Sequence, residues 1–267
     1  MRTEDVLGLA LELADVADGL TSSAFGRVVD VRRKADGSEV TAVDVAVEAA
    51  LRERILAAFP EHLVLGEEDG WGDADVSRRQ GVPVWTIDPI DGTTNFVAGN
   101  PIFATLIACS VDGRDLVGVV SAPALGSRWD GVVGQGARQD GRPVQVSDVD
   151  RLVDAEVSVG GFHDIEDRTP GLLAALAHGT RRQRGYGDFW AYCLLAAGST
   201  DAVLEARLNA WDLAAVRAVA EPAGGRVTNL VGVDCSDGGS VVATYGDPHG
   251  ELPALTAARR RGLPERA

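Results

Sequence analysis

The sequence predicts a protein of mixed α and β structure, in the α+β or α/β class. Apolar residues recur at helical spacing over residues 6–17 and again over residues 46–59. Strand-like runs bounded by Gly, Pro and Asp follow one another over residues 84–133. With 267 residues, the chain can bury a substantial core in one large domain or two moderate ones.

The first predicted element is a helix over residues 3–19. Thr3 is its expected N-cap, and Glu4 and Asp5 stand in its first turn, where the positive end of the helix dipole favours acidic side chains. The apolar positions continue at helical spacing as far as Gly19. We expect this helix to be structural.

Residues 28–43, which have a strand-like and loop-like pattern, separate the first helix from a second one over residues 44–59. The basic residues 32–34 precede a predicted turn at residues 35–38, and a solvated turn is the simplest interpretation of this basic cluster. Asp44 opens the second helix, and an Asp at a helix start is usually an N-cap.

Three consecutive acids, residues 67–69, follow a short predicted strand over residues 63–65, and alone they are typical of a solvated loop. Residues 71–81 indicate an exposed hairpin or loop. Residues 84–87 predict a strand end, and Pro89 is predicted to stop the ladder because it has no N–H group. Further strands of an antiparallel ribbon are predicted over residues 104–111, 116–121 and 129–133.

A boundary is predicted at residues 143–150, which gives an N-terminal half of residues 1–143 and a C-terminal half of residues 144–267. The C-terminal half alternates strand and helix patterns. Its predicted strands cover residues 155–159 and 202–205, and its predicted helices cover residues 170–178, 189–196 and 209–223. The Arg-rich tail, residues 257–267, is expected to be a frayed terminus.

The run Asp88-Pro89-Ile90-Asp91-Gly92-Thr93-Thr94-Asn95-Phe96 is the most informative stretch of the chain. Asp88 and Asp91 lie on opposite sides of a tight bend, so both carboxylates and the carbonyl of Ile90 can face one point. Hard oxygen ligands that converge in this way suit Mg²⁺. Gly92 permits a close turn, and the amides that follow can open a helix that receives a phosphate. Taken alone, the run is also compatible with an ordinary acidic turn.

This run resembles the signature of the inositol monophosphatase superfamily of metal-dependent, lithium-sensitive phosphatases. A second run, Trp211-Asp212-Leu213-Ala214-Ala215, is followed by Ala223-Gly224-Gly225 and is similar to the second signature of that superfamily. Gly66-Glu67-Glu68 precedes both. The resemblance implies a layered αβαβα sandwich, often a homodimer, with the metal site where the two halves meet.

The resemblance also implies roles for individual residues. Two or three Mg²⁺ ions would be held by Glu67, Asp88, the Ile90 carbonyl, Asp91 and Asp212. Thr93, polarised by Asp44, would orient the attacking water together with Glu67, although Val43 stands where a polar residue is common. The phosphate would rest on the amides of Gly92 and Thr93 with Asp91 beside it, and Asp212 would also bind the leaving alcohol. The loop that carries Lys34 would close over the metals.

The charge balance restricts the partners. Acidic residues number 40 against 25 basic ones, for a formal charge of −15. This charge argues against a nucleic-acid partner, and it would repel a phosphate ester unless metal ions reverse the local sign. The three cysteines have no metal-type spacing and are interpreted as reduced thiols. Neither a signal peptide nor a membrane-spanning run is recognisable, so we expect a soluble, cytoplasmic protein without a membrane partner.

The alcohol part of the substrate is predicted from Arg182 and residues 185–193. Both resemble the histidinol-phosphate phosphatase branch of the superfamily more than the inositol branch. A carboxylate such as Asp188 would bind an ammonium or imidazole group, which a polyol does not require. An N-cap is the other interpretation of Asp188.

The sequence therefore predicts a Mg²⁺-dependent phosphomonoesterase that converts L-histidinol phosphate to L-histidinol and phosphate in histidine biosynthesis. Inositol-1-phosphate or another sugar phosphate is the alternative substrate. A non-catalytic binding or regulatory protein on the same fold is a third hypothesis. It is disfavoured because a scaffold has no reason to keep the complete set of acids.

Overall fold

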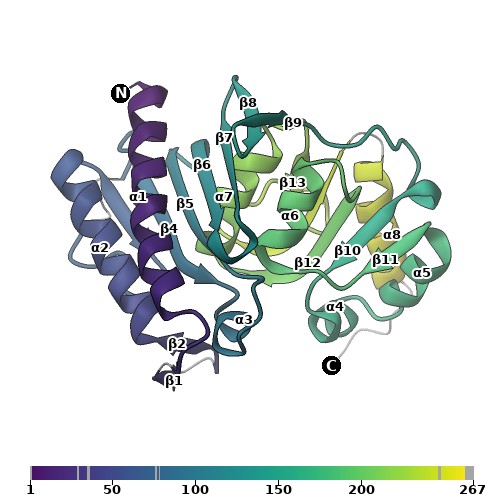
Figure 1. Ribbon diagram of the computed structural model, residues 1–267. Coiled ribbons are helices and arrows are strands. Elements are labelled where there is room, and N and C mark those ends of the chain that lie inside the picture. The colour runs from purple at the N-terminus through teal and green to yellow at the C-terminus, as the bar shows by residue number, and fades with distance from the viewer. Residues whose placement is uncertain are drawn as a thin grey trace.

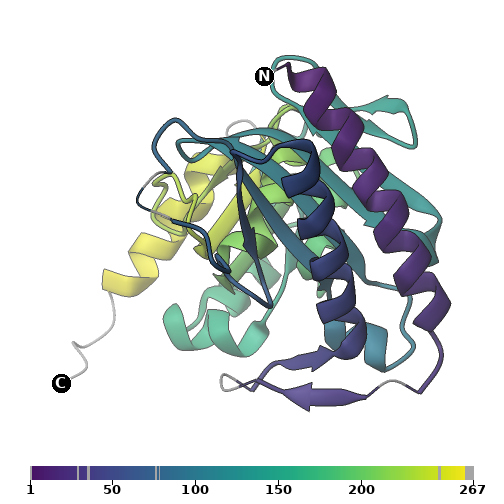
Figure 2. The ribbon, with the colours of Figure 1, turned by 90° about the vertical axis from the view of Figure 1, so that its left-hand side faces the viewer.

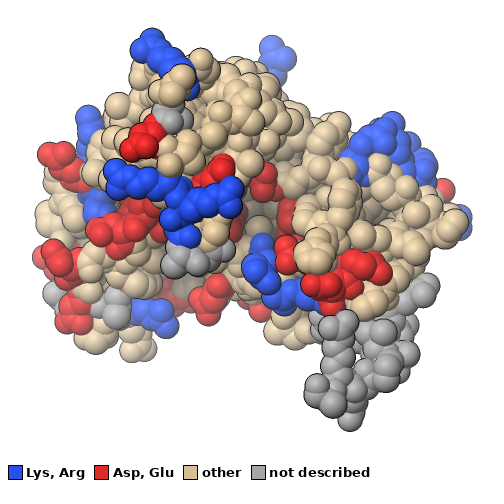
Figure 3. All heavy atoms as spheres, turned by 90° about the horizontal axis from the view of Figure 1, so that it is seen from below, with Lys and Arg blue, Asp and Glu red and all other residues tan. Residues whose placement is uncertain are grey.

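In a computed structural model the chain forms alternating layers of helix, sheet, helix, sheet and helix (Figure 1). The structure describes residues 2–28, 30–34, 37–75, 77, 79–245 and 248–261. The predicted layered αβαβα sandwich is confirmed. Basic and acidic side chains are interspersed over the face seen in Figure 3.

The first outer layer consists of α1 (Thr3–Ala24) and α2 (Ala42–Ala58). Figure 2 shows them side by side across one face of the larger sheet. Buried residues of both helices, among them Leu13 and Leu51, pack against that sheet. Arg2 is the N-cap of α1, so the prediction of Thr3 as N-cap is wrong by one residue, and the helix continues past Gly19.

The larger sheet has the strand order β3-β4-β5-β6-β7-β8-β9. Only the β3–β4 pair is parallel among its pairs of described strands. Its strands are β3 (Leu63–Gly66), β4 (Val84–Asp91), β5 (Ala104–Val111), β6 (Arg114–Ala122), β7 (Ser127–Val132), β8 (Gly136–Gln139) and β9 (Arg142–Val144). On β5, Leu106 faces the middle layer whereas Ile107 faces α1 and α2, so both faces are covered. The predicted hairpin of β5 and β6 is confirmed.

The prediction that Pro89 stops the ladder is wrong. Strand β4 continues to Asp91 through an irregularity in its pairing with β5, where Asp88 lies opposite Leu106 and Asp91 lies opposite Ala104. The three-residue step on β4 therefore faces a two-residue step on β5, which defines a bulge. A proline is tolerated there because the bulged residue has no ladder hydrogen bond to lose.

The middle layer is formed by α6 (Asp188–Ala196) and α7 (Ala210–Ala220). Both helices lie between the two sheets and share one apolar core with them. Glycine allows α7 to approach β7 closely, because a Cβ on Gly131 would lie 2.0 Å from the carbonyl oxygen of Ala218. This contact lies near the C-terminal end of α7 and holds the helix against the larger sheet.

The smaller sheet has the strand order β11-β10-β12-β14-β13. Its strands are β10 (Glu156–Val159), β11 (Arg182–Arg184), β12 (Ala202–Leu208), β13 (Arg226–Thr228) and β14 (Gly239–Thr244). The second outer layer covers its far face and consists of α4 (Phe162–Arg168), α5 (Leu172–Gly179) and α8 (Pro248–Arg261). The sequence predicted α5 but not α4 or β14.

The predicted frayed tail is wrong in part, because α8 continues to Arg261, and residues 262–267 lie outside the described part. The shorter elements are β1 (Val31–Arg33), β2 (Glu39–Thr41), α3 (Thr93–Val97), η2 (Pro123–Leu125) and η3 (Leu152–Asp154). The predicted turn at residues 35–38 falls partly outside the described residues, which omit 35 and 36.

The larger sheet is built from residues 63–144 and the smaller one from residues 156–244. The division of the chain into two halves at residue 143 remains a prediction. All three cysteines are buried and free. Within the described ranges, no helix combines the length and the apolar character needed to span a bilayer.

Candidate active site

Three aspartates from distant parts of the chain meet between the sheets. Asp88 and Asp91 lie near the end of β4, and Asp212 lies in the first turn of α7. Each offers a carboxylate oxygen, and these oxygens all lie within 4.8 Å of one another. In a regular strand, residues three apart face opposite sides, so the bulge in β4 is what turns both of its aspartates toward α7.

Glu67 belongs to the same group. It follows the end of β3, and its N–H donates a 3.1 Å hydrogen bond to the carbonyl of Ile87 on the neighbouring strand. Its negative charge acts on Asp88 and Asp212, which places the carboxylate close to both. We call Glu67 and the three aspartates the acid site.

Burial and mutual repulsion raise the proton affinity of the acid site. Burial raises the pKa of Asp88 well above its usual range, and the charges of Glu67, Asp91 and Asp212 raise it further. Burial and the charges of Asp188 and Asp212 have the same effect on the pKa of Asp91. Burial also raises the pKa of Asp212 to about 6. The site therefore concentrates negative charge that is costly without a cation.

An unsatisfied oxygen indicates where a cation would bind. Oδ1 of Asp88 is fully buried and has no hydrogen-bond partner among the described residues. Buried carboxylate oxygens are normally hydrogen-bonded or bound to a metal. Four carboxylates and a nearby backbone carbonyl form an all-oxygen donor set that fits Mg²⁺.

Lys34 reaches the edge of the acid site from the chain segment between β1 and β2. Its Nζ atom lies 2.8 Å from Oε1 of Glu67 and 2.8 Å from Oε1 of Glu68. Burial lowers the pKa of Lys34, but these two contacts outweigh burial and raise it. Burial raises the pKa of Glu68 to about 7. The interpretation of the basic cluster as a solvated turn is therefore wrong for Lys34.

Thr93 and Asp44 lie beside the acid site. The Thr93 hydroxyl lies 2.9 Å from the carbonyl oxygen of Ile90 and 3.3 Å from Oδ1 of Asp44, and its single hydrogen can be donated to either. Oδ2 of Asp44 accepts from the N–H and the hydroxyl of Thr41, which caps α2. The prediction of Asp44 as an N-cap is wrong, because Thr41 is the N-cap and Asp44 is the N3 residue of the capping box. Asp44 also contacts Thr93, as the resemblance implies.

Gly92 joins β4 to α3 in the left-handed conformation, with φ +80°. A Cβ at this position would also lie only 3.0 Å from the carbonyl oxygen of Ile102. Both facts require glycine at this position. The amides at the start of α3 lie next to Asp91 in the chain.

A cavity of about 340 Å³ lies where residues 185–188 meet β12 and the β10–α4 turn. Its polar lining includes Asn95, Asn100, Tyr186, Asp188 and Glu205. We call it the alcohol pocket. Asp188 adopts a left-handed backbone conformation with φ +53°; the residue is exposed at its surface, and partial desolvation of its carboxyl group raises its pKa. Because the charge of Asp188 also acts on Asp91, the alcohol pocket adjoins the acid site.

The sequence prediction missed Glu205 as a site residue. Its carboxylate is buried and accepts a 3.2 Å hydrogen bond from the N–H of Asp188. Burial, then the charge of Asp188, raises its pKa to about 8. The available signal was an acid in the otherwise apolar strand run 202–206, seven residues before Asp212. The alcohol pocket is therefore lined by two carboxylates, of which that of Glu205 is buried and that of Asp188 is more exposed.

Two glycines make room for the Glu205 carboxylate. A Cβ on Gly160 would lie 2.1 Å from Oε1 of Glu205, and a Cβ on Gly187 would lie 2.9 Å from the same atom. Neither glycine has a positive φ, so the requirement is for space and not for backbone freedom. The carboxylate is held against bare backbone on two sides.

The structure does not bring Arg182 to the acid site. Arg182 lies on the edge strand β11, where its guanidinium pairs with the carboxylate of Glu156 on β10. Its side chain is about half exposed, and it is absent from the lining of the alcohol pocket. The other site residues named from the sequence lie in or beside the acid site and this pocket.

Comparison with known proteins gives a consistent result. Residues 2–263 match the sequence profile of the Inositol monophosphatase family. A histidinol-phosphatase from Mycobacterium tuberculosis is 45% identical over 260 residues, which cover 94% of this chain and 97% of that protein. A histidinol-phosphatase from Streptomyces coelicolor is 39% identical over 260 residues, with 93% and 95% covered. An IMPase structure from Thermotoga maritima has a TM-score of 0.84 at 28% identity and covers 96% of this chain and 98% of its own.

The five layers, the acid site and these relatives define the protein as a phosphomonoesterase of the αβαβα class. Enzymes of this kind depend on Mg²⁺, and the acid site supplies the oxygen ligands that this ion prefers. The chain belongs to the inositol monophosphatase family. The resemblance seen in its two signature runs is thereby confirmed.

Proposed function

We propose that this phosphatase hydrolyses L-histidinol phosphate to L-histidinol and inorganic phosphate in the presence of Mg²⁺. The observation that carries the proposal is the pair of carboxylates that line the alcohol pocket, the buried Glu205 and the neighbouring, more exposed Asp188. Two neighbouring acids are stabilised by a cationic partner, and histidinol carries an ammonium and an imidazole group. The names of the two histidinol-phosphatases that are 45% and 39% identical support the same substrate.

Mg²⁺, in two or three copies, would be held by Glu67, Asp88, the Ile90 carbonyl, Asp91 and Asp212. When bound, this ion lowers the pKa of water, neutralises phosphate oxygens and stabilises the leaving oxygen. The chain contributes the arrangement of its own groups around that chemistry. No covalent bond between enzyme and phosphate is required.

Thr93 orients the attacking water in this proposal. When its hydroxyl donates to Asp44, its lone pairs face away and can accept a hydrogen bond from water. Asp44 is itself held by two bonds from Thr41, so the acceptor for Thr93 is fixed. Glu67 takes the remaining hydrogen of the water.

The phosphate would bind the amides of Gly92 and Thr93 at the start of α3, with Asp91 beside them. Asp212 would contact the leaving oxygen, and Asp188 with Glu205 would bind the amine or imidazole of the alcohol. The contact of Arg182 with substrate, the homodimer and the cytoplasmic location remain predictions.

The test is phosphate release in Mg²⁺ from L-histidinol phosphate and, in parallel, from inositol-1-phosphate, with Asp88→Asn as the blank. A preference for L-histidinol phosphate that disappears in the blank supports the proposal. A preference for inositol-1-phosphate would keep the metal-dependent mechanism and overturn the substrate assignment. Release from neither substrate would overturn it in favour of other phosphate esters or the binding-protein hypothesis.

A further inference from the structure

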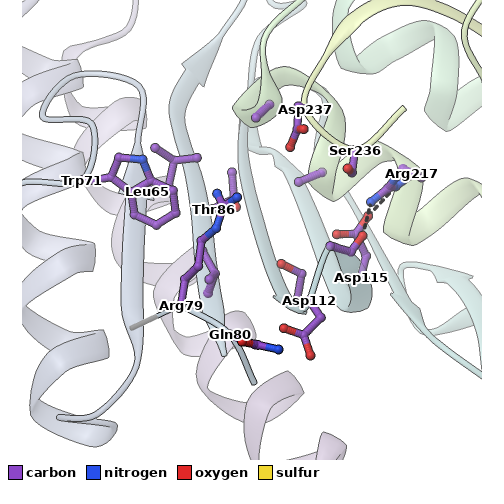
Figure 4. Close-up of a pocket in the computed structure, with 15 residues that line it drawn as sticks. Leu65, Trp71, Arg79, Gln80, Thr86, Asp112, Asp115, Arg217, Ser236 and Asp237 are labelled. Carbon is purple, nitrogen blue, oxygen red and sulfur yellow. Dashed lines mark hydrogen bonds and ion pairs between the residues drawn. The ribbon is translucent and has the colours of Figure 1, made fainter. Parts of the chain in front are cut away.

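A short loop after β3 carries Glu67, a member of the acid site. We call residues 66–70 the Glu67 loop. The N–H of its first residue donates a 2.8 Å hydrogen bond to the carbonyl of its last, and β3 is an edge strand of the larger sheet. Figure 4 shows Leu65 and Trp71, the residues on either side of the loop, on the wall of a cavity of about 420 Å³. The base of the loop is therefore open on this side.

On the other side, Glu48 of α2 binds the backbone of the Glu67 loop. Glu48 is buried, and its Oε2 atom accepts a 2.7 Å hydrogen bond from the N–H of Glu68. Its Oε1 atom accepts a 3.0 Å hydrogen bond from the N–H of Asp69. Hydrogen bonds to an ionised acceptor are roughly twice as strong as neutral ones. One carboxylate therefore fixes the two residues that follow Glu67.

Arg52, one turn further along α2, holds Glu48 and the loop together. Its Nη2 atom donates to Oε1 of Glu48 at 2.9 Å and to the carbonyl of Gly70 at 2.9 Å. Its Nη1 atom donates to the carbonyl of Val64 on β3 at 3.0 Å. The guanidinium supplies the opposite charge that a buried carboxylate needs. It also fixes the strand that enters the loop and the last residue of the loop.

Gly66 leaves the space that the Glu48 carboxylate occupies. A Cβ on Gly66 would lie 2.1 Å from Oε1 of Glu48. The φ of Gly66 is not positive, so the requirement is for space and not for backbone freedom. The same fixed segment presents the Glu68 carboxylate to Lys34. The glycine of the Gly66-Glu67-Glu68 run is thus explained by a residue of α2.

We propose that Glu48 is a positioning residue that holds Glu67 at the acid site and thereby raises the affinity of this site for Mg²⁺. Because the loop is fixed in advance, binding of the ion does not have to order Glu67. Groups that orient metal ligands typically contribute about 10–100-fold to metal affinity. Glu48 acts through the loop backbone, since its own carboxylate already accepts three hydrogen bonds. This role rests on the proposed binding of Mg²⁺ by Glu67 and not on the identity of the phosphate ester.

The experiment is isothermal titration of the metal-free full chain with MgCl₂. Glu48→Gln keeps the size of the side chain, but its amide nitrogen cannot accept a hydrogen bond from a loop N–H. We expect the Mg²⁺ concentration at half-saturation to rise about tenfold. Arg52→Lys keeps the net charge of the protein but loses the forked contact with Val64 and Gly70. It should raise the half-saturation concentration as well, which a long-range effect of charge would not do.

Glu53→Gln is the matched control, because Glu53 is an exposed acid on the same helix, and it should bind Mg²⁺ as the wild type does. Thermal unfolding in a chelating buffer separates positioning from stability. Variants that unfold at a lower temperature but bind Mg²⁺ as tightly as the wild type would make Glu48 merely structural and overturn this role alone. A wild type that binds no Mg²⁺ would overturn the metal assignment together with it. If Glu48→Gln does not fold, the titration of Arg52→Lys decides.

Discussion

The backbone N–H of Phe189 donates a 2.6 Å hydrogen bond to Oδ2 of Asp91. Asp91 ends the strand of the first signature, and Phe189 lies in the first turn of α6, nearly one hundred residues later. The ring of Phe189 is buried in the core between the sheets. Phe189 directly follows Asp188, which lines the alcohol pocket. One buried hydrogen bond therefore fastens this segment to the acid site.

Loss of this hydrogen bond should make Asp91→Ala less stable than Asp88→Ala. Asp91→Ala leaves the buried N–H of Phe189 without its partner, at a cost of about 1–3 kcal/mol. Asp88→Ala removes a carboxylate whose Oδ1 has no described partner, and it relieves repulsion. In metal-free buffer, thermal unfolding should therefore show a higher midpoint for Asp88→Ala than for Asp91→Ala. Equal midpoints would contradict a stabilising role for the bond.

Magnesium should reverse the effect of the acid site on stability. In a chelating buffer, Asp88→Asn should unfold at a higher temperature than the wild type, because a buried like charge is removed. With Mg²⁺ in excess, the wild type should gain stability in proportion to its binding and overtake the variant. Differential scanning calorimetry in both buffers measures this crossover, and a variant less stable in both would refute it.

Thr93→Val tests the orientation of water. The substitution keeps the size of the side chain but removes the hydroxyl that contacts Asp44 and Ile90. We expect kcat to fall about 100-fold or more while KM changes little, since the loss concerns the attacking water and not substrate binding. Thr94→Val, at the exposed neighbouring position, is the matched control and should retain kcat. Comparable losses in both variants would argue for a structural effect.

The pH dependence of stability should reveal Glu205. Its pKa is raised from an ordinary 4.5 to about 8 in the folded protein. Between about pH 4.5 and pH 8, the folded state therefore binds more protons than the unfolded state. The contribution of Glu205 to the free energy of unfolding falls as pH rises through this range. Glu205→Gln removes the titrating group and keeps an acceptor for the N–H of Asp188.

In urea unfolding without metal, the free energy of unfolding of Glu205→Gln should rise relative to that of the wild type between pH 5 and pH 8, by an amount on the order of a few kcal/mol. Glu166→Gln, at an exposed position of α4, serves as the control and should show no such trend. A constant difference across the range would mean that Glu205 does not titrate there.

Close packing of α7 on the larger sheet can be tested at two glycines. Gly131→Ala places a methyl group 2.0 Å from the carbonyl of Ala218 and should destabilise the protein by about 1–3 kcal/mol or more. Gly19→Ala, in α1 with no atom near its added methyl, should stabilise it by about 0.5–1 kcal/mol. Denaturant midpoints measure both, and tolerance of Gly131→Ala would show that the helix can move away.

The sequence was most informative where function depends on local spacing. Asp88, Asp91 and Asp212 lie in short runs with recognisable patterns, and the structure brings all three together. Glu205 has no such pattern. Its burial results from the pairing of β12 with β10 and β14, which are far from it in the chain, so no local window indicates it.

Long-range pairing also explains the errors. Pro89 is an ordinary strand breaker by local rules, but a bulge in the β4–β5 pairing accommodates it. Lys34 stands in a polar turn, so local sequence predicts a solvated side chain. The fold nevertheless brings Glu67 and Glu68 to it. The contact of Arg182 with Glu156 depends in the same way on the neighbouring strand β10.

Helix α7 packs on β6 and β7 although its chain neighbours, β12 and β13, belong to the other sheet. A chain cut between β9 and β10 would therefore leave one fragment with Asp88 and Asp91 and the other with Asp212. Neither fragment could assemble the acid site by itself. Phosphate release from a mixture of the two would then report their reassociation directly, and so make this enzyme a self-contained assay for fragment complementation.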